Sequence, residues 1–222
     1  MKTIDPSTNR ALARPFQSHQ WSAESRQVNT PYVIRKILSK SSEAETFQKY
    51  MGEFGRESGL FEAISIKRHG RGETAPFELD VVLNFKALGI NNVGYGVSQS
   101  LPIVVELFSQ PRKTRFAIQQ PEVHLHPKAQ AALGDLFFRL AISEQKSFCI
   151  ETHSDYLIDR FRLNYRKMKA HPSAQVLFFE RGAAGNLVHA LEIDEDGHLS
   201  ANQPPGYRKF FVNEALAILD ID

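Results

Sequence analysis

Cysteine is almost absent from this chain, which has one in 222 residues. A single cysteine excludes the disulfide framework that stabilises many small secreted proteins. The residue, Cys149, lies in the apolar run Ser147–Ile150. We therefore expect a small buried side chain there rather than a nucleophile or a metal ligand.

Long apolar runs and a signal peptide are missing as well. No uninterrupted apolar stretch is long enough to span a bilayer. The first residues, Met1–Asp5, do not resemble the start of a signal peptide. Together with the scarcity of cysteine, these absences predict a cytoplasmic protein with no membrane role.

The chain also lacks an excess of one charge. Its 27 basic and 25 acidic residues give a net charge of +2, which is too even a balance to indicate nucleic-acid binding by itself. The hydrophobic content of 42% is enough to bury a core in a domain of this length. Composition thus predicts a folded globular protein and leaves its partner open.

The chain begins with polar sequence. We expect most of residues 1–30, which are rich in Ser, Gln, Asn and Arg, to form an arm that a partner orders. Helical spacing and then strand-like runs follow as far as residue 89. The predicted elements are helices near Tyr32–Leu38 and Ala44–Phe54, and a hairpin of strands Leu60–Lys67 and Phe77–Phe85 with a basic tip at His69–Glu73.

From residue 90 strands and helices alternate, which is typical of a layered α/β core. We therefore predict two parts, an N-terminal α+β segment at residues 1–89 and an α/β part at residues 90–222 that carries the function. The predicted elements of the second part are a loop at Ile90–Gly96, helices at Val97–Phe108, Pro127–Ile142, Ser154–Arg166 and Tyr207–Leu219, strands at Arg115–Gln119 and Ser147–Glu151, and a hairpin of Ala174–Glu180 with Leu187–Ile193.

A glycine-containing turn at Asn92–Ser100 leads directly into a helix. Gly94 and Gly96 let backbone N–H groups approach an anion, and a helix N-terminus adds about half of a positive charge. Ser98 and Gln99 are therefore candidates for holding a phosphate. The alternative is an ordinary glycine turn in which Ser98 is the helix N-cap.

An apolar strand ends in polar residues at Gln119, Gln120 and, after a proline, Glu122. The carboxyl edge of an open α/β sheet is where ligands bind. Glutamine can orient a nucleophile or bond to a metal-bound water, but it cannot act as a base. Glu122 is the remaining carboxylate. The nearby pair His124 and His126 lacks a third ligand, so we predict no metal site of its own.

A second apolar strand ends in the same way, and this likeness predicts that the two strands are neighbours in one sheet. The polar residues that follow it include His153. An imidazole at a strand end can bond to a phosphate. The alternative is that Thr152, Ser154 or Asp155 caps the next helix and that His153 is incidental.

In this order the three segments resemble the signature, Walker B and switch regions of ABC-type ATPases of the SMC, RecF and OLD-like kind. The resemblance covers roughly Val93–Leu219 and implies the C-terminal part of a P-loop NTPase layered fold. It implies that Ser98 touches the γ-phosphate of a nucleotide bound to the opposite subunit. It also implies that Leu125–His126 lies where the family's D-loop crosses the dimer interface.

The resemblance further assigns the two strand ends. Gln119 stands where the family has an acid for the Mg²⁺ shell, and Gln120 stands where it has the acid that polarises the attacking water. His153 matches the switch histidine beside the γ-phosphate. These two glutamines put hydrolysis in doubt, and Glu122 is the carboxylate left as a partial substitute.

One family element is missing, because the pattern Gly-x-x-x-x-Gly-Lys-Ser/Thr occurs nowhere in the chain. The chain alone should therefore bind nucleotide poorly and be inactive. We expect ATP and Mg²⁺ only in a composite site, within a homodimer or a hetero-complex with a chain that carries this Walker A motif. The alternative function is a catalytically silent, ATPase-derived interaction module. A nuclease or DNA-binding role rests on family association alone.

Overall fold

In a computed structural model, the structure describes residues 30–72, 75–168, 171–183, 185–201, 203–207, 213 and 216–217. The predicted N-terminal arm lies almost wholly outside these residues. So does most of the last predicted helix, Tyr207–Leu219. Among the residues that are described, no helix is long and apolar enough to cross a membrane.

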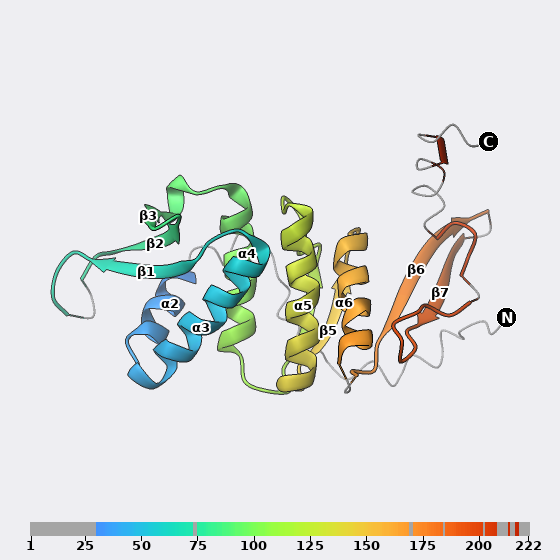
Figure 1. The fold of residues 1–222 in the computed structure, drawn as a ribbon, viewed down its shortest axis with the longest axis horizontal. Coiled ribbons are helices and arrows are strands. Elements are labelled where there is room, and N and C mark those ends of the chain that lie inside the picture. Colours follow the sequence, from blue (N-terminus) through green and yellow to red (C-terminus); the bar gives the residue numbers. More distant parts are fainter. Residues whose placement is uncertain are drawn as a thin grey trace.

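The first part of the fold is two helices beside an antiparallel sheet (Figure 1). The predicted hairpin is confirmed as β1 and β2, and a third strand, β3, pairs with β2. Sequence analysis missed β3 because it is short and follows Asn84 and Phe85, which turn the chain with φ of 50° and 62°. The elements are α2 (Thr30–Leu38), α3 (Ser41–Ser58), β1 (Ala63–Arg68), β2 (Phe77–Leu83) and β3 (Lys86–Gly89).

The second part alternates helices and strands as predicted, with boundaries close to those expected. Its elements are the 3-10 turn η2 (Ile90–Asn92), α4 (Tyr95–Ser109), β4 (Arg115–Gln119), α5 (Pro127–Ser143), β5 (Ser147–Glu151), α6 (Asp155–Lys167), β6 (Gln175–Gly182) and β7 (Gly185–Glu192).

Strands β4 and β5 are parallel neighbours, with Gln119 opposite Glu151 at their carboxyl ends. This pairing confirms the prediction that the two apolar strands are adjacent in one sheet. Strands β6 and β7 form the predicted hairpin, which is a separate antiparallel pair. The parallel register brings the polar residues after β4 and β5 to the same edge.

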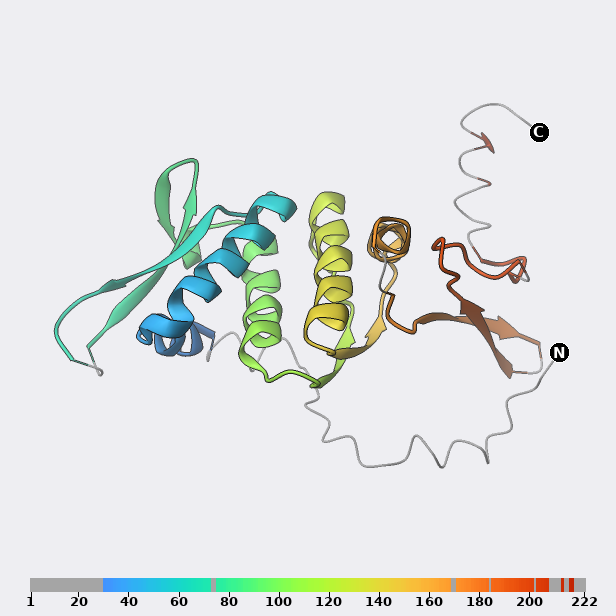
Figure 2. The same ribbon diagram turned by 60° about the horizontal axis from the view of Figure 1, so that its bottom comes forward.

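Helices α4, α5 and α6 stand side by side over one face of the β4–β5 pair (Figure 2). The ring of Phe137 on α5 lies 5.1 Å from that of Phe148 on β5. Helices α5 and α6 touch so closely that a Cβ at Gly134 would lie 2.5 Å from the carbonyl oxygen of Leu157. Helix α5 is therefore the central element of the core.

The buried core is continuous across the predicted boundary at residue 89. It contains Phe54 and Val81 from the first part and Val104 and Leu136 from the second, all 0% exposed. Burying such side chains is the main source of stability in a domain of this size. The division into residues 1–89 and 90–222 stays a prediction.

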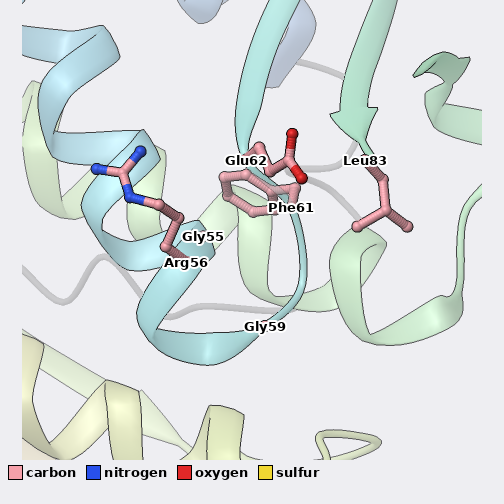
Figure 3. A pocket seen from close by; sticks show the side chains of 6 residues that line it. All are labelled: Gly55, Arg56, Gly59, Phe61, Glu62 and Leu83. Atoms are coloured by element: carbon pink, nitrogen blue, oxygen red, sulfur yellow. The ribbon is translucent and has the colours of Figure 1, made fainter. Parts of the chain in front are cut away.

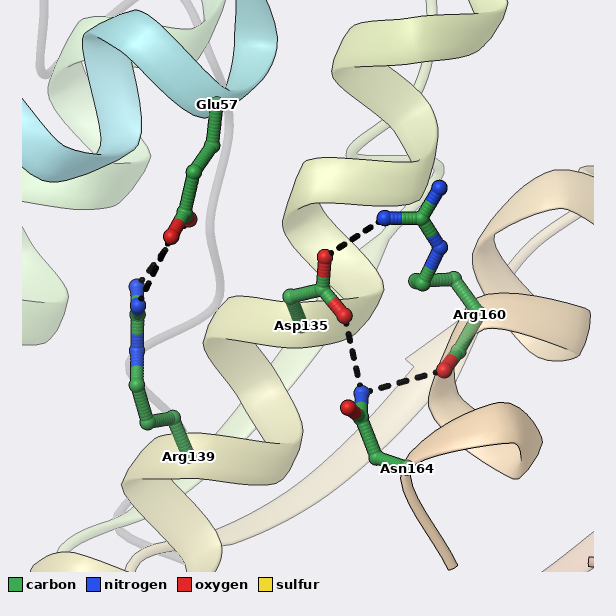
Figure 4. Close-up of polar contacts among 5 residues, drawn as sticks. All are labelled: Glu57, Asp135, Arg139, Arg160 and Asn164. Atoms are coloured by element: carbon green, nitrogen blue, oxygen red, sulfur yellow. Dashed lines mark hydrogen bonds and ion pairs between the residues drawn. The ribbon is translucent and has the colours of Figure 1, made fainter. Parts of the chain in front are cut away.

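Polar contacts on the outside of α5 link it to α3 and to α6 (Figure 4). Arg139 donates to Glu57 of α3 at 3.2 Å. Asp135 accepts from Arg160 at 2.8 Å and from Asn164 at 2.9 Å, both on α6. Such partly exposed pairs add little stability, about 0–1 kcal/mol each, so their main effect is to fix how the helices are aligned.

The other face of the β4–β5 pair is exposed. Phe116 and Ile118 point into the core, whereas Ala117 and Cys149 are exposed. The prediction that Cys149 is buried is therefore wrong. Its apolar neighbours in the sequence alternate between the two faces, and within the described part of the chain only one face is covered by helices.

Candidate functional site

The carboxyl ends of β4 and β5 are joined directly. The backbone N–H of Gln120 donates to the carbonyl oxygen of Glu151 at 2.8 Å, so pairing continues past the last residue of β4. The side-chain amide of Gln119 lies 3.5 Å from the Glu151 carboxylate. Gln120 then turns the chain out of the sheet with φ of 43°, a conformation that costs energy in a residue other than glycine.

The side chain of Glu122, after β4, reaches the loop that follows β5. Its side chain is only 7% exposed, and Oε1 accepts the backbone N–H of His153 at 2.7 Å. The other oxygen, Oε2, is buried and has no hydrogen-bond partner among the described residues. The structure thus brings together two of the predicted site residues, Glu122 and His153, while the His153 side chain stays exposed.

The loop between Glu122 and α5 is stabilised by a main-chain hydrogen bond within the loop and by the N-cap of α5. Leu125 donates its N–H to the Glu122 carbonyl at 3.0 Å, and its side chain lies in the core. His126 is the N-cap of α5, where Nδ1 accepts the N–H of Lys128 at 3.2 Å. Pro127 suits the first turn that follows, because its missing N–H has no helical partner there.

The start of α4 packs against this same loop. The rings of Tyr95 and His124 meet edge to face at 4.8 Å, and a Cβ at Gly96 would lie 3.4 Å from the His124 carbonyl oxygen. The structure therefore brings the first predicted segment onto the second. Sequence analysis did not single out Tyr95, although the sequence shows an aromatic residue between two glycines. In the structure its side chain is 60% exposed.

Helix α4 begins earlier than predicted. Gly94 is its N-cap residue, with no side-chain cap, and Tyr95 is its first residue. The alternative in which Ser98 caps the helix is therefore wrong. Ser98 and Gln99 lie half-buried in the opening turns. A Cβ at Gly94 would meet nothing within 4 Å, so the N-cap position of α4 is open.

The second strand end leads into a capped helix. Ser154 Oγ accepts the Leu157 N–H at 3.1 Å, which confirms the predicted cap of α6. The same hydroxyl lies 2.5 Å from Gln130 Oε1, and Gln130 donates to the Leu125 carbonyl at 2.8 Å. Sequence analysis missed this second bridge between the loops, since Gln130 stands within a helix and carries no motif.

We call the surface formed by Gly94–Gln99, Gln119–Glu122, Glu151 and His153 the site edge. Its exposed oxygen ligands are the amide of Gln119 and the carboxylate of Glu151. Within the described ranges, no group of three or more His, Cys, Asp or Glu side chains could hold a metal ion. One carboxylate and one amide suit Mg²⁺ only if phosphate oxygens and water complete its shell.

A shallow hollow elsewhere in the molecule has a volume of about 220 Å³ (Figure 3). It lies where the end of α3 meets β1 and β2. Its lining residues are Gly55, Arg56, Gly59, Phe61, Glu62 and Leu83. None of these belongs to the site edge, so the candidate site is an open edge of the sheet and not this hollow.

These features define a layered α/β protein with polar side chains at the carboxyl edge of a parallel strand pair. A family model for the AAA ATPase domain matches residues 5–158, and the chain belongs to this family. No curated protein matches the chain.

Solved structures with a similar fold include SMC ATPases. One chain, from work on ATP-driven dimerisation and DNA-stimulated activation of SMC ATPases, has 10% identity and a TM-score of 0.50, with 85% of this chain and 97% of that chain covered. This likeness confirms the predicted α/β fold, similar to an SMC ATPase head of the P-loop NTPase class.

Two further matches are Smc head domains with coiled coils. The Pyrococcus furiosus head, bound to the C-terminal domain of ScpA, has 10% identity and a TM-score of 0.48, with 89% of this chain and 52% of that chain covered. The Pyrococcus yayanosii head has 11% identity and a TM-score of 0.49, with 78% and 30% covered. The chain spans about half of the first of these and less of the second.

Proposed function

We propose that this chain supplies part of a composite nucleotide site, as the C-terminal half of an ABC-type ATPase head. One observation carries the proposal. The start of α4 packs on the loop after β4, and that loop is bonded to the loop after β5. Three segments far apart in the sequence therefore form one continuous edge.

In this proposal each part of the site edge has a separate role. The open N-terminus of α4, with Ser98 and Gln99, receives the γ-phosphate of a nucleotide held on another subunit. The exposed imidazole of His153 bonds to a γ-phosphate on its own side. Gln120 orients an attacking water but cannot remove its proton, so hydrolysis is weak even in a complete site.

The proposed site needs parts that these 222 residues do not contain. A Walker A loop would bring the lysine and the N–H groups that hold the β- and γ-phosphates. Mg²⁺ would then be held by phosphate oxygens, water, the Gln119 amide oxygen and the Glu151 carboxylate. The partner is a second copy of a longer chain or a separate chain that carries Walker A.

The SMC relatives suggest how the halves would meet. The first matched structure concerns ATP-driven dimerisation of SMC ATPases and their activation by DNA. We extend dimerisation to this chain as part of the proposal. Association with DNA would follow by family analogy alone, and a cytoplasmic location stays a prediction.

A second candidate is a catalytically silent interaction module. Gln119 and Gln120 favour it, because neither can replace a Walker B acid. Such a module would bind its partner through the exposed face of β4 and β5, which includes Ala117 and Cys149. The two candidates differ in one respect, because only the composite site makes association depend on nucleotide.

The test is association of this chain with a polypeptide that carries a Walker A motif, measured by sizing with light scattering, with and without Mg-ATP. The composite site predicts a complex that ATP strengthens and that Ser98→Arg and His153→Ala weaken. Matched controls are Gln175→Arg and His69→Ala, which make like changes on exposed residues of β6 and the β1–β2 hairpin. Association that is equal without ATP and in all four variants supports the silent module instead.

A further inference from the structure

Glu122 is a buried carboxylate that no step above uses. It is 7% exposed, and Oε2 is buried with no partner among the described residues. Burying a carboxylate is costly unless its oxygens are paired, and an apolar side chain of the same size would avoid that cost. What Glu122 does have is one short bond, from the backbone N–H of His153 to Oε1 at 2.7 Å.

That bond is the last link in a series of contacts that starts on α4. The Tyr95 ring lies against His124, and a Cβ at Gly96 would lie 3.4 Å from the His124 carbonyl oxygen. Two residues before His124, the carboxylate of Glu122 holds the backbone of His153. The two elements proposed to meet phosphate, the start of α4 and the His153 loop, are thus connected through one short loop.

Gln130 also connects the loops after β4 and β5, but it contacts Ser154 and not His153. Gln130 holds the Leu125 carbonyl and lies 2.5 Å from Ser154 Oγ, which is the cap of α6. It therefore fixes the start of α6. Among the hydrogen bonds of the described residues, the one to Glu122 is the bond that holds the His153 N–H.

We propose that Glu122 is a positioning residue that couples the start of α4 to His153. A partner that displaces Tyr95 or His124 moves the loop after β4, and the Glu122 carboxylate passes that displacement to the His153 backbone. Because it is only 7% exposed and Oε1 is held by the His153 N–H, this carboxylate is not placed to take a proton from water. The relevance of the coupling to nucleotide rests on the proposed function, but the coupling itself can be measured without nucleotide.

The test is heteronuclear NMR on the full ¹⁵N-labelled chain, following the His153 amide. In the wild type, Tyr95→Ala should shift this resonance, although the two residues do not touch in the described contacts. Glu122→Met keeps the size of the side chain and removes the acceptor. In Glu122→Met, the His153 amide should exchange with solvent about tenfold faster or more, as expected for loss of a bond to a charged group.

The coupling predicts a double-variant result that a purely structural role would not give. In Glu122→Met, adding Tyr95→Ala should no longer shift the His153 amide. In Glu122→Gln, which keeps an oxygen acceptor but loses the charge, the amide should move upfield and still respond to Tyr95→Ala. The control is Glu151→Gln, an exposed carboxylate at the same edge, which should leave the response intact.

Two results would overturn the proposal. One is a His153 amide that responds to Tyr95→Ala equally in the wild type and in folded Glu122→Met. If Glu122→Met does not fold, Glu122→Gln decides, and an unchanged His153 amide there overturns the proposal. Neither result bears on ATP-dependent association, so this inference and the proposed function can fail separately.

Discussion

Helix α5 approaches α6 so closely that a Cβ at Gly134 would lie 2.5 Å from the Leu157 carbonyl oxygen, whereas a Cβ at Gly94 on the site edge would meet nothing within 4 Å. The interior is filled by apolar side chains, and Phe137 is 0% exposed. At the site edge Gln119 and His153 are exposed. The comparison separates residues that fold the protein from residues left free to bind.

The largest effect on folding is expected at Phe137. Phe137→Ala removes a ring from the centre of the core and leaves a cavity, so we expect a loss of about 3–5 kcal/mol in the free energy of unfolding. Chemical denaturation followed by circular dichroism measures it. Phe179→Ala is the control, since this ring is 67% exposed on β6 and should change stability by less than about 0.5 kcal/mol. Equal losses would mean that the hairpin is as tightly packed as the core.

A smaller loss is expected where α5 meets α6. Gly134→Ala places a methyl group against the Leu157 backbone, which cannot move without shifting α6, so the expected cost is about 1–3 kcal/mol. Gly94→Ser is the matched change at the site edge. Serine is a good N-cap, so stability should stay the same or rise slightly. Thermal melts of both variants decide, and a destabilised Gly94→Ser would show that the edge is packed after all.

At the site edge, the residues proposed to contact phosphate should be dispensable for folding. Ser98→Arg and His153→Ala should keep the wild-type circular dichroism spectrum and lie within about 0.5 kcal/mol of its free energy of unfolding. Ser98 is half-buried whereas His153 is exposed, so a large arginine at position 98 is more prone to disturb the packing. Ser98→Arg is therefore the stricter of the two tests. A variant that unfolds would show that its residue has a structural role.

The smallest effect is expected in the exposed turn after β7. The backbone N–H of His198 donates to Asp194 Oδ1 at 2.7 Å, and this bond lowers the pKa of the Asp194 carboxyl below its ordinary value of 3.8. A lowered pKa means that the turn is stabilised above pH 3.8 and loses that support as the pH falls through the pKa of the folded state. The protection of the His198 amide, which is its exchange rate compared with the intrinsic rate at the same pH, should therefore fall on acidification. In Asp194→Asn this protection should be low at all pH values.

Sequence alone predicted the strands that position the site. Strands β4 and β5 have the predicted bounds because each is a short apolar run ended by polar residues, and the prediction that they are neighbours followed from that likeness. The local pattern could not show whether both faces of the pair are covered. This is why Cys149 was expected to be buried and is exposed.

Contacts between segments that are distant in the sequence were also not predicted. Nothing in the sequence around Gln130 indicates that it bridges Leu125 and Ser154, because the bridge depends on how α5 packs beside α6. The start of α4 was also misplaced. Glycines at 94 and 96 suggested a loop up to Gly96, but the helix begins at Tyr95, whose ring is held against His124.

The central claim is that the site edge is one part of a nucleotide site and cannot turn over ATP without a Walker A chain. Steady-state ATP turnover by the purified chain alone tests it most directly, in the wild type and in Gln119→Asp/Gln120→Glu, which restores both acids. The account predicts no turnover above the protein-free blank in either, because the lysine that holds the β- and γ-phosphates is missing. Turnover at an ordinary ATPase rate that survives stringent purification and is abolished by His153→Ala would contradict it.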